Sequence, residues 1–552
     1  MGQILKMRPK KKSKKLPPTQ TSRTGPPMVQ TSVPKRPGTT PTTSGQPKKK
    51  ARGTNGSSNC SPMPATTTSR GTQPVWAEEQ AAELGAIQHP DWCSFYIDKL
   101  GNLIQGLIRK CGRTLRLNLW LDFAGMAPEK ESGNAIAAKL CERFGMAVEF
   151  EIYMACDLNE SSRKFIGQNF APKHMAEDAT QRNWETCTLI TTLGELLVMP
   201  REGVDIYIAC YPCGPWSKRG KRLGLSDNDG RLYEVAINTV AILNPFAYLM
   251  ENVCQIEGDF DVINAYTKER LPHFTSYCLK GIDPLQHDYP VKKNRLIQFG
   301  TNNGGVDTDG LQAALTVIAQ NPMPLTKKYR QFLGLSTTSR SFWQRFDQLA
   351  TYDEMQVLAS KPCTCSTDPM AICTSHPCRC QECKSGANQL KCSWRGKAMD
   401  FIHAHFGAAS RTFVGNATGK LTYCNVLDIY GQLDITSPRV RNMLNLVAHL
   451  PKCQPLDATA AVMDISQGID RAHIATDGTL PTAATNSQLL CLCDASVLNE
   501  FQMGELMGHN MRALNFAGLS ASQVRRLLGM SVHVSVMGVG LLALLGAIGY
   551  GS

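Results

Sequence analysis

Short apolar runs alternate with segments of helical spacing through the first half of the chain. The runs that predict buried strands, because they are almost continuously apolar, are Leu115–Leu121, Phe150–Cys156, Asp205–Cys210 and Phe246–Met250. The segments that predict helices are Trp92–Lys110, Ala135–Phe144 and Gly230–Leu243. Strands that alternate with helices predict an α/β fold with a mainly parallel sheet.

Two of the predicted strands end in residues that carry chemistry. The run Asp205–Cys210 stops at Tyr-Pro-Cys-Gly-Pro, since proline lacks an N–H and glycine is free to turn. This places Cys213 at the carboxyl end of one strand, and Glu251 and Asn252 follow the next. Open α/β sheets bind ligands at the carboxyl ends of their strands, so a thiol and a carboxylate are predicted at one edge.

An ordered series of motifs surrounds this pair. Pro212-Cys213 is followed by Ser217, by Gly220–Gly224, by Gly230-Arg231-Leu232-Tyr233 and by Glu251-Asn252-Val253. The series resembles the catalytic core of the cytosine-C5 DNA methyltransferases. The resemblance implies a Rossmann-like, S-adenosylmethionine-dependent methyltransferase sheet with a separate target-recognition module. The alternative is that Cys213 is a buried, inert cysteine.

The resemblance also implies a role for each matching residue. Cys213 is expected to attack C6 of a flipped-out cytosine, and Glu251 to hold N3 and the amino group of the base. Arg295 is expected on the O2 side of the base, unless it is only a surface arginine before a strand. A basic loop after Cys213 is expected to contact DNA phosphates and to stabilise the thiolate. The expected substrate-binding residues, in this loop and elsewhere, are Ser217, Lys218, Arg219, Lys221, Arg222, Asn252 and Lys293.

The same resemblance places cofactor residues after other strands. Phe123 and Gly125 match the family's Phe-x-Gly turn, although Ala127 and Pro128 replace two usual glycines. An acid after the second strand is expected to bind ribose hydroxyls, and one in an Asp-x-Thr-Gln turn to bind the adenine amino group. These acids are Asp157 and Asp178, and each is alternatively a turn residue or helix cap.

Two later segments match the family less completely. Ser531 lies in Gly-Met-Ser-Val, where Met530 replaces the family's Asn, and is expected at the cofactor. Before Arg295, Lys293 replaces an Arg and Val291 a Gln. The apolar segment Val534–Tyr550 is shorter than a typical membrane span, so a buried core helix and no membrane association are expected.

The net charge of +13 comes from the amino-terminal tail. Residues 1–77 hold 15 Lys and Arg and no Asp or Glu, and have few large apolar side chains, which predicts disorder. Their basic runs, Lys10–Lys15 and Lys48–Arg52, suit a nuclear import receptor or DNA phosphates, so a nuclear location is expected. The alternative is a solvated tail without a dedicated partner.

Twenty-one cysteines without a secretory signal indicate a reducing compartment, with thiols or metal sites in place of disulfides. Eight potential zinc ligands gather within 30 residues, and a plain reduced Cys-rich loop is the alternative. They are Cys363, Cys365, Cys373, His376, Cys378, Cys380, Cys383 and Cys392.

These observations predict five parts in the chain. They are a disordered basic tail (1–77), a helical lead-in (78–112), a catalytic core (113–300), a target-recognition region (301–490) with a Cys-rich insert (363–392), and a segment that returns to the core (491–552).

Three rival functions remain open from the sequence. The first is the same chemistry on RNA cytosine, as in a transfer-RNA-directed relative. The second is a catalytically weakened, methyltransferase-like DNA-binding protein, suggested by Ala127, Pro128, Val291 and Met530. The third, an amino-methyltransferase, needs Asp or Asn before the Pro, whereas Tyr211 stands there.

Overall fold

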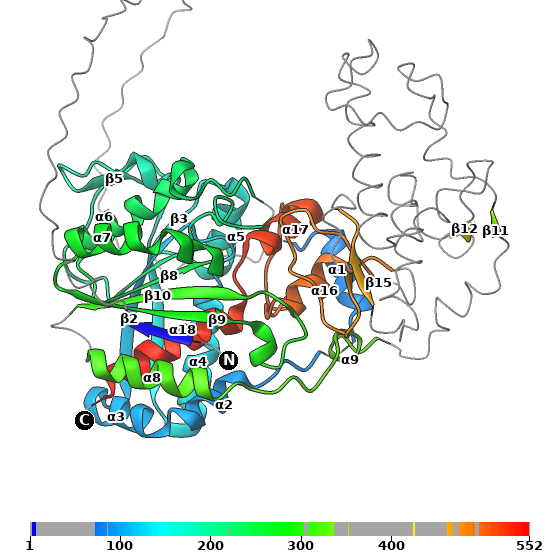
Figure 1. Cartoon of the computed structure of the whole chain (residues 1–552), viewed down its shortest axis with the longest axis horizontal. Helices are drawn as coiled ribbons and strands as arrows, with labels where there is room; N and C mark the ends of the chain where they lie inside the picture. Colours follow the sequence, from blue (N-terminus) through cyan, green and yellow to red (C-terminus); the bar gives the residue numbers. More distant parts are fainter. Residues whose placement is uncertain are drawn as a thin grey trace, which may run out of the picture. The chain divides into compact units, whose positions relative to one another are not determined.

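A mixed sheet with helices on both faces forms the centre of the computed structural model (Figure 1). The structure describes residues 3–6, 72–85, 87–218, 220–302, 307–335, 351–352, 423–424, 461–466, 474–491 and 496–550. Arg219, most of the predicted tail, and most of the predicted target-recognition region, including residues 363–392, lie outside the described residues. The predicted boundaries of the five parts therefore stay predictions.

The central sheet has the strand order β1-β9-β10-β8-β7-β2-β3-β4 in the described part of the chain. The strands from β8 to β4 in this order run parallel, and β10, β9 and β1 are antiparallel to their neighbours. The bounds are β1 Gln3–Lys6, β2 Thr114–Asp122, β3 Ala147–Cys156, β4 His174–Ala176, β7 Ile206–Ala209, β8 Ala247–Asn252, β9 Phe274–Ile282 and β10 Arg295–Asn302.

The order of the parallel strands reverses between β2 and β7. The chain leaves β2 toward β3 on one side and later returns to form β7 on the other side of β2. Open α/β sheets bind ligands outside the carboxyl ends of the strands at such a switch point. The Rossmann-like methyltransferase sheet predicted from the sequence is thus confirmed by its topology.

Helices cover both faces of this sheet, as Figure 1 shows for α6 and α7 on one side and α4, α8 and α18 on the other. The α-helices are α1 Val75–Glu83, α2 Trp92–Lys99, α3 Gly101–Cys111, α4 Pro128–Phe144, α5 Glu160–Phe170, α6 Leu232–Leu243, α7 Phe260–Arg270, α8 Thr308–Gln320, α9 Tyr329–Phe332, α16 Glu500–Leu506, α17 Ala521–Met530 and α18 Val534–Ile548. The 3-10 helices are η1 Ala179–Gln181, η2 Gly224–Ser226, η3 Asp229–Arg231, η4 Cys254–Asp259 and η5 Pro284–Gln286.

Short strands form three smaller sheets in the described residues. The pairs are β5 with β6 and β11 with β12, and β13 lies between β14 and β15. Their bounds are β5 Thr188–Ile190, β6 Leu196–Val198, β11 Thr351–Tyr352, β12 Tyr423–Cys424, β13 Val462–Asp464, β14 Ile474–Ala475 and β15 Leu489–Cys491.

The apolar carboxyl-terminal segment forms a buried core helix, as expected. Residues Val534–Ala547 of α18 are buried, and the helix packs against α8, α4, α3 and α2. Glycines permit the close approach: a Cβ at Gly538 would lie 2.0 Å from the Trp92 ring, and one at Gly540 2.7 Å from Leu249. In the described residues no individual helix has the length and apolar character of a membrane span, although α17 and α18 together, with a 43° bend, meet that test.

Two predicted helices differ from those observed. The single helix predicted over Trp92–Lys110 is two helices, α2 and α3, because Leu100 leaves helical geometry and is followed by Gly101. The helix predicted over Ala135–Phe144 begins earlier, at Pro128. Proline is favoured at the first helical position, since its fixed φ suits the helix and its missing N–H would have no intrahelical partner.

Candidate active site

The turn that follows β2 lies at the switch point and forms one part of the candidate site. Phe123, Gly125 and Ala127 all have left-handed backbone conformations, with φ of 57°, 56° and 50°. A side chain at Gly125 would meet no atom within 4 Å, so open space faces this turn. Ala127 precedes α4 and is fully buried, and it adopts the backbone conformation that favours glycine.

A buried ion pair fixes the end of β2 immediately before this turn. Arg182 Nη2 lies 2.5 Å from Asp122 Oδ1, and both side chains are almost fully buried. Tyr207 donates to Asp122 Oδ2 at 2.7 Å and Trp120 donates to Oδ1 at 3.1 Å. Because each carboxylate oxygen is satisfied, the charged end of the strand is held in one position.

The two acids assigned to the cofactor follow the next two strands. Asp157, after β3, accepts the Gly125 N–H at 2.8 Å and the Asn159 N–H at 2.8 Å. Burial raises the pKa of Asp157, and these hydrogen bonds oppose that shift. Asp178, after β4, caps η1 by accepting the Thr180 N–H and hydroxyl at 2.8 and 2.7 Å. Both acids thus lie at the predicted edge, and both also act as turn or helix caps.

Cys213 and Glu251 reach the same edge from neighbouring strands. Ala209 of β7 pairs with Met250 of β8, so the chain continues from these positions to Cys213 and to Glu251. The Asn252 side chain joins the two strand ends, because its amide donates to the Tyr211 carbonyl at 3.1 Å. Cys213 is half-buried, and its carbonyl accepts the backbone N–H groups of residues 216 and 217.

Two basic residues of the segment entering β10 lie beside Glu251. Arg295 Nε is 2.5 Å from Glu251 Oε1. Lys293 is fully buried and donates to the Ser531 carbonyl at 2.5 Å. Burial raises the pKa of Glu251, whereas the charges of Arg295 and Lys293 lower it. Burial and the charge of Arg295 lower the pKa of Lys293, and the electrostatic influence of Glu251 and Cys213 opposes this shift.

The basic loop after Cys213 is anchored to η4. Trp216 donates from its indole N–H to Asp259 Oδ2 at 2.7 Å, and the same oxygen accepts the Leu225 N–H at 3.3 Å. Lys218, Lys221 and Arg222 are exposed, whereas the Ser217 hydroxyl accepts the Gly220 N–H at 3.1 Å. A hollow of about 460 Å³ lies between the loop and η4, lined by Pro215, Trp216, Lys218, Arg222, Leu223, Gly224, Gln255, Gly258 and Asp259.

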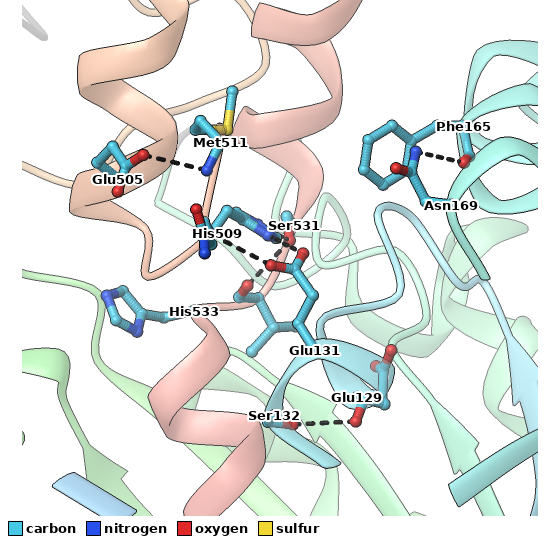
Figure 2. A network of polar contacts seen from close by, with 12 residues as sticks. Glu129, Glu131, Ser132, Phe165, Asn169, Glu505, His509, Met511, Ser531 and His533 are labelled. Carbon is cyan, nitrogen blue, oxygen red and sulfur yellow. Dashed lines mark hydrogen bonds and ion pairs between the residues drawn. The ribbon is translucent and has the colours of Figure 1, made fainter. Parts of the chain in front are cut away.

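Ser531 belongs to a buried polar network that sequence reasoning did not identify (Figure 2). His509 lies between Glu131 and Ser531, with its Nδ1 2.5 Å from Glu131 Oε1 and its Nε2 3.3 Å from Ser531 Oγ. The Ser531 hydroxyl donates to the Val532 carbonyl at 2.9 Å. This network connects α4, the segment after α16 and the segment before α18.

A second residue that sequence reasoning missed is Glu129, in the first turn of α4. Its side chain is 1% exposed, and its Oε1 accepts the thiol of Cys210 at 3.4 Å. Burial raises the pKa of Glu129 to about 7, and the negative charges of Glu251 and Glu131 add to this shift. Acids are common in the first turn of helices, so its position in the sequence gave no signal of burial.

The predicted zinc ligands Cys363, Cys365, Cys373, His376, Cys378, Cys380, Cys383 and Cys392 lie outside the described residues. Within the described ranges, no group of three or more His, Cys, Asp or Glu side chains is arranged to hold a metal ion. The zinc site therefore stays a prediction.

Comparison with known proteins gives matches in one family. Residues 137–265 match the family described as C-5 cytosine-specific DNA methylase, a span that includes Asp157, Asp178, Cys213 and Glu251. The chain is 29% identical over 121 residues to the type II methyltransferase M.HgiCII of Herpetosiphon aurantiacus, covering 21% of this chain and 26% of the relative. It is 36% identical over 104 residues to M.HaeII of Haemophilus aegyptius, covering 17% and 31%. It is 21% identical over 244 residues to the DNA (cytosine-5-)-methyltransferase DMT5 of Cryptococcus neoformans, covering 43% and 10%.

These matches span less than a third of each of these curated relatives. Among solved structures, a putative DNA modification methyltransferase encoded within a prophage (E. coli) aligns with a TM-score of 0.41 at 15% identity, covering 78% of this chain and 99% of that one. The Dnmt2 methyltransferase of S. pombe aligns with a TM-score of 0.38 at 12% identity, covering 78% and 98%. The ordered motifs and the match over residues 137–265 show that this part of the chain is similar to the C-5 cytosine-specific DNA methylases.

Proposed function

We propose that this protein transfers a methyl group from S-adenosylmethionine to C5 of cytosine in DNA, through a covalent adduct with Cys213. The observation that carries the proposal is the meeting of three chain segments. Cys213 follows β7, and the Glu251–Arg295 ion pair joins the ends of β8 and β10 beside it. All three lie at the switch-point edge, where the turn Phe123–Ala127 also lies.

The described residues fit S-adenosylmethionine on structural grounds. Open space faces Gly125, and the turn around it has the left-handed geometry that permits close backbone approach. Phe123, Gly125, Asp157 and Asp178 would hold the cofactor, and Ser531, in the segment before α18, is the further residue expected there. The two acids keep acceptor capacity, because a carboxylate oxygen has two lone pairs. When bound, the cofactor supplies a methyl group on a positively charged sulfur.

The residues of the chain have distinct roles in the proposed reaction. The Cys213 thiolate adds to C6 of cytosine, which makes C5 electron-rich enough to accept a methyl group. Glu251 holds N3 and the amino group of the base, and its raised pKa favours a shared proton there. Arg295 binds the O2 side and fixes the Glu251 carboxyl. A base, such as water, then removes the C5 proton, the double bond between C5 and C6 re-forms, and Cys213 leaves as the thiolate.

DNA is proposed as the substrate because the exposed basic loop suits phosphate contacts. A cytosine inside a duplex cannot reach Cys213, so the base must leave the stack, which costs a few kcal/mol. Lys218, Arg219, Lys221 and Arg222 would contact the flanking phosphates from the loop that Trp216 anchors.

The direct test is capture of the adduct. The protein is incubated with S-adenosylmethionine and with DNA or RNA that carries 5-fluorocytosine, because fluorine at C5 blocks the step that releases the enzyme. We expect a covalent complex with DNA that Cys213→Ala abolishes. Cys254→Ala is the matched control, since Cys254 is also half-buried and follows β8. A covalent complex with RNA but not with DNA would show that the substrate is RNA. An adduct that still forms in Cys213→Ala would exclude Cys213 as the nucleophile.

Two further proposals rest on sequence alone. The basic runs Lys10–Lys15 and Lys48–Arg52 support import into the nucleus, and alanine replacement of both runs in a fluorescent fusion should abolish nuclear accumulation. The seven cysteines and one histidine of residues 363–392 support zinc binding, which metal analysis of the purified protein measures. Unchanged nuclear accumulation or a protein without zinc would exclude the respective proposal.

A further inference from the structure

Glu129 presents a buried carboxyl that the protein itself leaves partly unsatisfied. The side chain is 1% exposed, and Oε1 has the Cys210 thiol as its partner at 3.4 Å. Oε2 has no partner of good hydrogen-bond geometry among the described residues, and the backbone N–H of Glu129 itself lies close enough to the carboxyl to lower its pKa against the effect of burial. A buried carboxyl oxygen without a partner is costly, so a residue of this kind calls for an explanation.

The charges around Glu129 make its environment negative. Glu251 at the end of β8 and Glu131 on the same helix both act on its carboxyl, and Cys210, directly after β7, is a thiol whose pKa is raised by burial. The nearby cations are engaged elsewhere: Arg295 pairs with Glu251, and Lys293 donates to the Ser531 carbonyl. His509 is the partner of Glu131. The buried carboxyl of Glu129 therefore lies in a negative environment that a cation would complement.

The position of Glu129 specifies which ligand would supply that cation. It lies two residues after Ala127, in the helical turn that begins where the left-handed turn of residues 123–127 ends. That turn lines the site proposed for S-adenosylmethionine, whose methionine end carries an ammonium, a sulfonium and a carboxylate and so has a net charge of one positive unit. A purely structural carboxyl at this position would stay protonated and bound to Cys210, and it would still leave one oxygen without a partner.

We propose that the Glu129 carboxylate binds the positively charged methionine end of S-adenosylmethionine and thereby selects for a cationic ligand. This inference rests on the proposed function, and it adds a residue outside the motifs matched in the sequence above. It explains why an acid stands buried beside Cys210 and Glu251, where an apolar residue would cost less.

Calorimetric titration of the full chain with S-adenosylmethionine tests the proposal without measuring turnover. Glu129→Gln keeps the shape of the side chain and removes its charge. We expect it to weaken binding about tenfold or more, because a hydrogen bond between charged groups is lost. Glu142→Gln, an exposed acid on the same helix, is the matched control and should bind as the wild type does.

Proton release gives an independent readout. With a pKa of about 7, Glu129 is about half protonated at pH 7, and a bound cation would drive the proton off. Titrations in buffers of different ionisation enthalpy should show about half a proton more released by the wild type than by Glu129→Gln. If Glu129→Gln did not fold, the number of protons that the wild type releases on binding S-adenosylmethionine would be the quantity that tests the proposal.

The ligand series separates the two cationic groups. S-adenosylhomocysteine keeps the ammonium and lacks the sulfonium. If Glu129→Gln weakens the affinity for S-adenosylmethionine more than the affinity for S-adenosylhomocysteine, Glu129 binds the sulfonium. If it weakens both affinities equally, Glu129 binds the ammonium. Equal affinity of the wild type and folded Glu129→Gln for S-adenosylmethionine, or no proton release by the wild type, would overturn the inference. A wild type that does not bind S-adenosylmethionine at all would instead overturn the proposed function.

Discussion

Arg295 Nε lies 2.5 Å from Oε1 of Glu251, and the two side chains are only 12% and 8% exposed. The pair connects the first residue of β10 to the end of β8, its antiparallel neighbour. Burial raises the pKa of Glu251, and Arg295 is the largest influence that lowers it. The ion pair therefore sets how readily Glu251 holds a proton for the base.

Replacement of Arg295 by Ala tests this relationship. Without the guanidinium the pKa of Glu251 rises further, so the decline in methyl transfer that follows Glu251 deprotonation should move to higher pH. The free energy of unfolding should fall by roughly 3–5 kcal/mol, nearer the lower value because Lys293 still attracts the carboxylate. The pH–rate profile and urea unfolding measure the two effects, and Arg295→Lys should shift the profile less. An unshifted profile in Arg295→Ala would separate Arg295 from the protonation of Glu251.

Cys213→Ser should abolish methyl transfer and leave DNA binding largely intact. A serine hydroxyl is far less ionised than a thiol at neutral pH, so addition to C6 should slow by at least about 10³-fold. Transfer of a labelled methyl group and a filter-binding measurement give the two quantities. Cys254→Ser serves as the control and should retain transfer, and transfer by Cys213→Ser at the wild-type rate would contradict the assignment.

Asp259→Ala should release the basic loop from η4. The change removes the acceptor of both the Trp216 indole N–H and the Leu225 N–H, and leaving such a donor unpaired costs about 1–3 kcal/mol. We expect faster tryptic cleavage at Lys218–Arg222 and a higher KM for DNA, with unchanged affinity for S-adenosylmethionine. Glu142→Gln should match the wild type in each measurement. Unchanged cleavage would show that the loop is held by other contacts.

The sequence predicted the strand ends because local chemistry determines them. Prolines after Cys210 cannot continue β7, and the apolar run before Glu251 requires a buried strand, so Cys213 and Glu251 were assigned to one edge correctly. The contacts among the side chains were not predictable in this way. His509 reaches Glu131 across 378 residues of sequence, and the burial of Glu129 depends on how α4 packs over Cys210. Such contacts follow from tertiary packing, which periodicity does not contain.

Ala127 illustrates a departure from the family pattern that the backbone accommodates. Its φ of 50° lies in the left-handed region, and its side chain is fully buried. Ala127→Gly relieves about 1 kcal/mol of backbone strain and loses a buried methyl of about 0.8 kcal/mol, so stability should change by less than about 1 kcal/mol. Ala127→Val should cost more than about 2 kcal/mol, because a β-branched side chain strongly disfavours this conformation. Urea unfolding compares the two, and equal stability of the Val and Gly variants would contradict the left-handed turn.

The buried carboxyl of Glu129 should make stability depend on pH. Its pKa is raised from 4.5 to about 7, so the folded protein binds this proton more tightly than the unfolded chain does. The stability that it contributes is therefore fully present below pH 4.5 and is lost as the pH rises through about 7. Glu129→Gln does not ionise, so at pH 8 it should be more stable than the wild type, by up to about 3 kcal/mol.

Thermal unfolding between pH 4.5 and 8 measures this difference. The advantage of Glu129→Gln should appear above pH 5, grow up to pH 8 and shrink again when S-adenosylmethionine is present in excess. The stability difference becomes smaller because a ligand that binds the ionised carboxylate gains this interaction only in the wild type and stabilises only its folded state through it. A difference that does not vary with pH would place the Glu129 carboxyl in contact with solvent, and one that varies with pH but not with the ligand would limit its role to the fold.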